Sequence, residues 1–199
     1  MKHTTSSRLA VASAAVAVAL AMAACSHATS RPSGPPSGDP LGGIAGTELY
    51  QRGMAMAAAG DFVRAEQYLT SAIARGYPEK RALPSLLRVC VASSRLRAAL
   101  SHAEPFLQRN PDAWSLRYLV ASIYLGVGEV DRARTSLERV IADAPEQPDA
   151  FYLLGLVLRD EVGDRPGAAR RFSRYLELAP RGKHAAEVRA ALRALGSAS

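Results

Sequence analysis

Few residues in this chain of 199 have the types and spacing that do chemistry. The histidines stand far apart and lack the short spacings of metal ligands. The four are His3, His27, His102 and His184. No nucleophile elbow, phosphate-binding loop or Cys-x-x-Cys motif occurs, and acidic residues such as Glu129 and Asp164 lie near expected helix ends, where capping accounts for them. We therefore predict a protein that is not an enzyme and that uses no metal and no cofactor.

The first of two cysteines, Cys25, stands at the end of an export signal. Lys2 and Arg8 supply its positive charge, and residues 9–21 form an apolar run too short for a comfortable membrane span. The sequence Met-Ala-Ala-Cys at 22–25 resembles the lipobox of bacterial lipoproteins, with Met where leucine is usual. That resemblance implies that Cys25 receives a diacylglycerol and a further acyl chain such as palmitate, enough for stable anchoring. The alternative is an ordinary secreted protein in which Cys25 is incidental.

The N-terminal region thus divides into a lipoprotein signal peptide at 1–24 and a lipidated tether at 25–45. The tether is rich in Ser, Pro and Gly with almost no apolar residues, so it cannot bury a core and is expected to be disordered. Ser26, rather than an acidic residue, follows the lipidated cysteine, which resembles the outer-membrane class of lipoproteins. We predict a lipid-anchored protein of the cell envelope, on the outer membrane facing the periplasm if the host has two membranes.

The rest of the chain repeats itself at intervals of about 34 residues. The turn between two expected helices and a small residue early in the second helix both recur in steps of 34, 34 and 35. The positions are Gly60, Ser94, Gly128 and Gly163 for the turn, and Ala65, Ala99, Ala133 and Ala168 for the helix. In the third copy, apolar residues at three- and four-residue spacing predict helices over 112–126 and 130–142. A period of this size is the signature of a helical solenoid.

The period, the small residue midway along the first helix and the closing proline together resemble the tetratricopeptide repeat (TPR) family. The resemblance implies an all-α fold, a right-handed α-solenoid of about four helix-turn-helix repeats. The expected TPR domain spans 46–180, with repeats at about 46–78, 79–111, 112–145 and 146–180, and a capping helix and tail follow at 181–199. The second copy departs most, with Leu87 in the small position and Ala103 in the bulky one. It also carries Pro84, expected in a first helical turn, and Pro105, expected to kink or end its helix.

The other cysteine, Cys90, shares its repeat position with Met56, Tyr124 and Leu158. We therefore predict a buried, reduced thiol that acts as a small hydrophobic residue. Because lipidation leaves only this one cysteine, no intrachain disulfide is expected.

In TPR solenoids the first helix of each repeat lines a concave groove, and here one groove position carries tyrosine in three of four repeats. Aromatic side chains give large contact area at low entropic cost, so they are candidate anchors for a partner. The predicted groove comprises Tyr50, Met54, Arg88, Tyr118, Ser122, Tyr152 and Arg159. The alternative is that these tyrosines are half-buried packing residues between neighbouring helices.

The expected partner is a protein. The groove lacks the lysines and asparagines with which the family's best-known mode clamps a C-terminal carboxylate, which favours a segment with apolar and acidic side chains. The formal net charge is +7, and removing the signal with Lys2 and Arg8 leaves +5, a modest excess spread over arginines mostly of second helices, which predicts a solvated surface. Export argues against nucleic acid, and we expect no small-molecule substrate and a chain that is monomeric by itself.

These features predict a membrane-anchored, non-catalytic interaction scaffold of the bacterial cell envelope. The resemblance to TPR lipoproteins implies a role in assembling an envelope complex, such as a pilus with its secretin or the outer-membrane assembly machinery. The alternatives are an accessory regulator of a cell-wall enzyme and, ranked last, a binder of RNA or another polyanion.

Overall fold

The computed structural model describes residues 43–196, which form nine α-helices and one π-helical turn, with no strand within that range. The helices are α1 (Gly46–Ala58), α2 (Phe62–Ala74), α3 (Glu79–Ala92), α4 (Leu96–Arg109), α5 (Trp114–Gly126), α6 (Val130–Asp143), α7 (Pro148–Val157), α8 (Arg165–Leu178) and α9 (Ala185–Gly196). The predicted signal peptide, the lipidation site Cys25 and nearly all of the tether lie outside the described residues.

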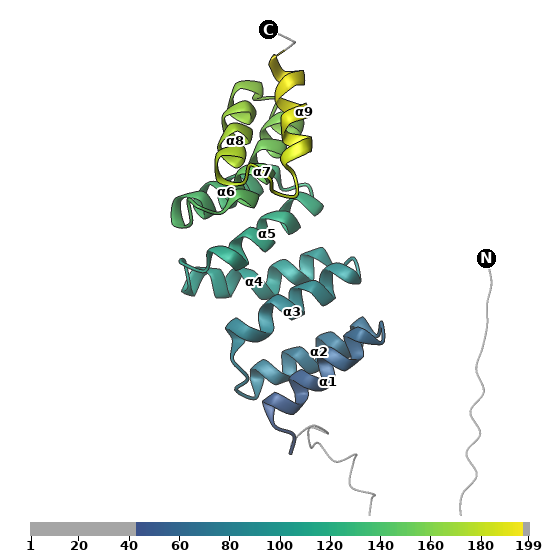
Figure 1. The fold of residues 1–199 in the computed structure, drawn as a ribbon. Helices are drawn as coiled ribbons and strands as arrows, with labels where there is room; N and C mark the ends of the chain where they lie inside the picture. The colour runs from purple at the N-terminus through teal and green to yellow at the C-terminus, as the bar shows by residue number, and fades with distance from the viewer. Residues whose placement is uncertain (1–42, 197–199) are drawn as a thin grey trace, which may run out of the picture. The chain divides into compact units, whose positions relative to one another are not determined.

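The helices pack in the order of the chain. Figure 1 shows antiparallel pairs, α1 with α2 through α7 with α8, following one another from the blue to the yellow end of the helical part. Each pair contacts the next, and α9 packs on α8. Contacts limited to sequence neighbours are the mark of a solenoid, so the predicted all-α repeat fold is confirmed.

The turns inside the four pairs share one backbone conformation. Gly60, Gly128 and Gly163 have φ of 78°, 79° and 77°, in the left-handed region that glycine adopts at no steric cost. Ser94 takes the same place in the second repeat with φ of 58°. The four turn positions predicted from the sequence therefore mark the ends of the first helices. In the second repeat the residue at this position is a serine, for which positive φ is sterically unfavourable.

Both prolines of the second repeat lie inside helices. Pro84 was expected in a first helical turn. It lies instead five residues after the start of α3 at Glu79. Pro105 does not end its helix either, because α4 continues to Arg109. A proline removes one backbone donor and crowds the preceding turn. Leu86 on α3 and Phe106 on α4 are buried in the core. Tertiary packing therefore holds both helices together despite the cost of their prolines.

The last step of 35 in the turn series means that the fourth repeat has one extra residue, and this residue does not lengthen the turn. It is taken up by a π-helical turn, Leu158–Val162, which continues α7 before Gly163. A π-turn fits one additional residue into a helix without breaking it. The next helix then begins at Arg165, with Pro166 in its first turn and the Asp164 carboxylate accepting from the Gly167 amide at 2.8 Å.

The core is built from side chains of complementary size on the two helices of a pair. A methyl group added to Gly53 would lie 2.9 Å from Leu69 Cγ, and one added to Gly155 would lie 2.5 Å from Phe172 Cε1. The small residue on the first helix therefore makes room for the large one on the second. No helix of the described part is long and apolar enough to cross a membrane.

Candidate functional site

The tyrosines of the predicted groove are all half-buried, and two of the three have partners within the chain. The Tyr50 ring on α1 stacks on Tyr77, with ring centroids 4.3 Å apart. Its hydroxyl lies 3.1 Å from Ser85 Oγ on α3. Arg88 of the predicted groove donates to the same Ser85 Oγ at 3.1 Å, so the first two repeats meet at this serine.

At the other end, Tyr152 joins α7 to the capping helix. Its ring stacks on His184 with a centroid separation of 3.7 Å, and its hydroxyl donates to the Glu187 carboxylate at 2.8 Å. The backbone amide of His184 in turn donates to the Tyr175 hydroxyl at 3.0 Å. Burial raises the pKa of Tyr152 to about 12, and the hydrogen bond to Glu187 acts in the same direction. Tyr152 is thus occupied in holding the C-terminal cap.

This geometry predicts that Tyr152→Ala loosens α9 without unfolding the repeats. The variant loses one aromatic stack and one charge-assisted hydrogen bond, together worth about 1–2 kcal/mol at a partly exposed site. We expect amide hydrogen exchange in residues 185–196 to speed up about tenfold, measured by mass spectrometry. Tyr152→Phe keeps the stack and should give a smaller change. Unaltered exchange in Tyr152→Ala would show that Val188 and Ala191 hold the cap alone.

Tyr118, on α5, differs from the other two. Within residues 43–196 its hydroxyl has no hydrogen-bonding partner, although the ring is half-buried against the C-terminal core. Burial raises the pKa of Tyr118; Asp149 adds to the rise and Lys183 opposes it. Lys183 and Asp149 form an ion pair at 2.9 Å near this ring. The middle tyrosine therefore presents a hydroxyl that the described part of the chain does not use.

The remaining predicted groove residues range from half-buried to exposed. Met54 packs partly against the N-terminal core. Arg88 and Ser122 are exposed, and the Ser122 hydroxyl donates to the Tyr118 carbonyl oxygen at 3.4 Å. Arg159 pairs with Asp160 at 2.6 Å and lies 5.7 Å from the centre of the Phe172 ring. Arg88 and Ser122 are exposed although each makes one hydrogen bond, so together with the Tyr118 hydroxyl they form the accessible part of the predicted groove.

Sequence reasoning missed the residues that meet the tyrosines. Ser85 and Glu187 each lie 35 residues after the tyrosine they contact, one repeat further along. That constant offset was a signal in the sequence.

A second polar cluster joins α4, α5 and α6. The Tyr124 hydroxyl donates to Glu104 at 2.8 Å, and Arg132 donates to the same carboxylate at 2.9 Å while lying 4.4 Å from the Tyr124 ring centre. Burial raises the pKa of Tyr124 to about 12, with Glu104 adding to it. These groups border a hollow of about 350 Å³. Because they satisfy one another, their plain role is to join neighbouring repeats.

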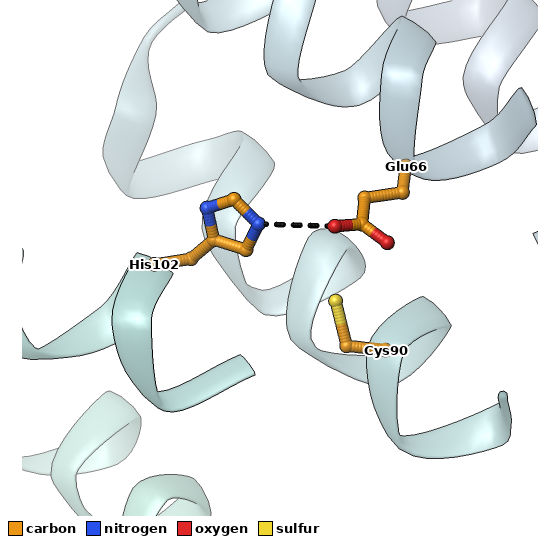
Figure 2. A group of neighbouring side chains, drawn as sticks. All are labelled: Glu66, Cys90 and His102. Atoms are coloured by element: carbon orange, nitrogen blue, oxygen red, sulfur yellow. Dashed lines mark hydrogen bonds and ion pairs between the residues drawn. The ribbon is translucent and has the colours of Figure 1, made fainter. Parts of the chain in front are cut away.

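The structure also brings together Glu66, Cys90 and His102, from α2, α3 and α4 (Figure 2). Cys90 is fully buried, as predicted, and burial raises the pKa of its thiol to about 11, with Glu66 adding to the rise and Arg95 opposing it. No sequence motif marks this cluster, because Glu66 and His102 are 36 residues apart and lie on different helices. The prediction that the chain uses no metal was based on the spacing of histidines along the sequence. That spacing does not show which side chains of different helices meet.

Comparison with known proteins agrees with the fold. A family model described as tetratricopeptide repeat matches residues 91–157. A TPR protein from Parabacteroides merdae superposes with a TM-score of 0.69 at 22% identity, over 77% of this chain and 60% of that one. MamA from Desulfovibrio magneticus RS-1 gives 0.61 at 22% identity, covering 69% of this chain and 77% of its own. No curated protein matches the sequence.

A further neighbour is YrrB, described as a TPR protein with an unusual peptide-binding site. It superposes with a TM-score of 0.62 at 19% identity, over 73% of this chain and 74% of its own. The described residues therefore have the fold of tetratricopeptide-repeat proteins, as the spacing predicted, and a model of that repeat matches residues 91–157. The chain spans about 60% of the length of the Parabacteroides protein.

Proposed function

We propose that the chain is a lipid-anchored, non-catalytic scaffold of a bacterial cell envelope, which binds a segment of a partner protein along the first helices of its repeats. The lipobox-like sequence at 22–25 supports the anchor. The TPR fold and the peptide-binding site described for YrrB support the mode of binding. In this proposal the partner is a component of an envelope assembly, of the pilus, secretin or outer-membrane assembly type.

One observation carries the binding proposal, the unused hydroxyl of the half-buried Tyr118. A half-buried aromatic ring with a free polar tip suits an interface, because the ring supplies apolar area while the hydroxyl donates to a partner. Ser122 lies one helical turn after Tyr118 on α5. The exposed Arg88 holds the same repeat position on α3 as Ser122 holds on α5. This arrangement favours a partner segment that brings an apolar side chain to Tyr118 and a carboxylate to Arg88.

The test is photo-crosslinking in cells with a reactive amino acid at position 122, followed by mass spectrometry. Position 139 serves as the matched control, because Arg139 is also exposed and lies on α6 of the same repeat. We expect capture of one envelope protein from 122 and not from 139. Capture from 139 alone, or from neither position, would contradict the groove proposal, and capture of a cell-wall synthase or hydrolase would favour the regulator alternative.

With the captured protein purified, Tyr118 can be tested directly. We expect Tyr118→Ala to weaken binding about 30-fold, the loss of about 2 kcal/mol typical of an aromatic anchor, and Tyr118→Phe to weaken it only a few-fold. Arg139→Ala should leave the affinity unchanged. Circular dichroism melts of each variant separate lost binding from lost folding. Equal affinities for Tyr118→Ala and the unchanged protein would mean that this tyrosine is a packing residue only.

A further inference from the structure

Three consecutive helices bring a carboxylate, a thiol and an imidazole to one place. The candidate ligand atoms of Glu66, Cys90 and His102 all lie within 4.8 Å of one another. His102 Nε2 is 3.3 Å from Glu66 Oε1, and Figure 2 shows the Cys90 sulfur directed toward the space beside these two groups. Glu66 and His102 lie on second helices of their repeats, whereas the tyrosines of the predicted groove lie on first helices.

The spacing of these atoms suits a tetrahedral metal ion. With nitrogen and oxygen ligands about 2.0–2.1 Å from zinc, two such ligands of a tetrahedron stand about 3.3 Å apart. His102 and Glu66 already have this separation. A zinc–sulfur bond of about 2.3 Å is longer, so the Cys90 sulfur needs to stand only slightly further away. Because all three atoms lie within 4.8 Å of one another, movements of about 1 Å in these side chains would complete the coordination.

We propose that Glu66, Cys90 and His102 form a binding site for one divalent metal ion of the zinc type. Thiolate, imidazole and carboxylate are the ligands that zinc takes in proteins, whereas magnesium and calcium take oxygen ligands. On binding, the Cys90 sulfur exchanges its proton for the metal, and the proton leaves to solvent. Thiolate and carboxylate then balance the two charges of the ion.

The residues around the cluster orient one of its ligands and leave a path for an ion from solvent. Arg95 forms an ion pair with Glu66 Oε2, which orients the carboxylate and leaves Oε1 toward His102. Supporting contacts of this kind fix ligands in metal sites. A hollow of about 550 Å³, lined in part by Glu66, Arg95 and His102, reaches the cluster from solvent. It gives the ion a path and leaves room for water as a fourth ligand.

A catalytic role suits the cluster less well. The Cys90 side chain has no accessible surface, so a substrate has no access to its sulfur. A metal ion needs only to reach the 27%-exposed His102 side chain and the 12%-exposed Glu66 side chain before it meets the thiol. The site also links α2 of the first repeat to both helices of the second, whose α3 and α4 share less contact than the helices of the other pairs. A bound ion would therefore stabilise the most irregular repeat.

The experiment is a titration of the full chain with Co²⁺, carrying Cys25→Ser so that Cys90 is the only thiol. We expect one Co²⁺ per chain, with the near-ultraviolet absorption of a thiolate bound to cobalt, and displacement by Zn²⁺. His102→Ala and Glu66→Gln should each weaken Co²⁺ binding about tenfold or more, and Cys90→Ser should abolish the absorption. His184→Ala is the matched control, because His184 also faces a carboxylate, Glu187, at 3.6 Å but no cysteine.

Melting supplies a second readout, since an ion that binds only the folded chain raises the melting temperature. Zn²⁺ should raise it for the Cys25→Ser chain and for His184→Ala, and should raise it less for His102→Ala. Should Cys90→Ser fail to fold, the His102 and Glu66 variants still decide, because both side chains lie at the edge of the core. Absence of the cobalt–thiolate absorption, or absorption unaltered by His102→Ala and Glu66→Gln, would overturn the proposal and leave a buried thiol beside a simple ion pair.

Discussion

We expect Leu87→Ala to lower the free energy of unfolding by about 2–5 kcal/mol, and Ala103→Leu in the same chain to restore most of that loss. Leu87 and Ala103 are both fully buried in the N-terminal core. They hold the repeat positions that Gly155 and Phe172 hold in the fourth repeat, where the two residues touch. The second repeat therefore has the large residue on its first helix and the small one on its second, the reverse of the fourth repeat.

The two single variants should fail for opposite reasons. Leu87→Ala leaves a cavity beside Ala103, whereas Ala103→Leu alone overfills the same space and costs about 1–3 kcal/mol. In the double variant the volumes match again, so the effects should be strongly non-additive. Urea denaturation followed by circular dichroism measures all four chains. Val91→Ala, at a 40%-exposed position of the same helix, is the control and should change stability by less than about 0.5 kcal/mol.

A double variant as unstable as the sum of the two single variants would contradict this account. It would mean that Leu87 and Ala103 do not face each other and that the departure of the second repeat from the TPR pattern is uncompensated. In that case the stability of the second repeat must come from elsewhere, and Leu86 and Phe106 are then the buried residues to test next.

The second large effect concerns the anchor. We expect Cys25→Ser to abolish incorporation of labelled palmitate and to move the protein from the membrane fraction to the soluble fraction. Each buried methylene of an acyl chain contributes about 0.8 kcal/mol to membrane binding, so the loss of all chains removes the anchor entirely. Serine keeps the size of the side chain but cannot form the thioether.

Cys90→Ser is the control for that experiment, because Cys90 is buried among α2, α3 and α4 and should take no lipid. It should label and sediment like the unchanged protein. If Cys25→Ser still carries palmitate or stays with the membrane, the lipobox interpretation is wrong. An ordinary signal peptide cleaved near this cysteine would then be the better account of residues 1–24.

Much of the fold followed from the sequence because its signals are local and repeated. The four turn positions, Gly60, Ser94, Gly128 and Gly163, all lie in the left-handed region, and one such turn in each repeat fixes the helix boundaries. Local reasoning failed where packing outweighed it. Pro84 lies inside α3, although a proline would favour a first turn.

The predicted binding site was only partly within reach of the sequence. Periodicity placed Tyr50, Tyr118 and Tyr152 on one recurring position. Periodicity does not show which tyrosine hydroxyl forms a hydrogen bond within the chain. The partners Ser85 and Glu187 lie 35 residues further along, on α3 and α9. Only the folded chain distinguishes Tyr152, which holds the cap, from Tyr118, whose hydroxyl has no partner in residues 43–196.

By itself, the sequence determined that this protein is a stack of helix pairs, because a period of about 34 residues can be counted along the chain, and a short lipobox-like motif at 22–25 predicts an export signal. Tertiary structure alone decided that Glu66, Cys90 and His102 meet, and which buried residues match in size. Those contacts join different helices, and the distance between two side chains there depends on helix crossing and rotation, which the spacing of residues along the chain does not specify.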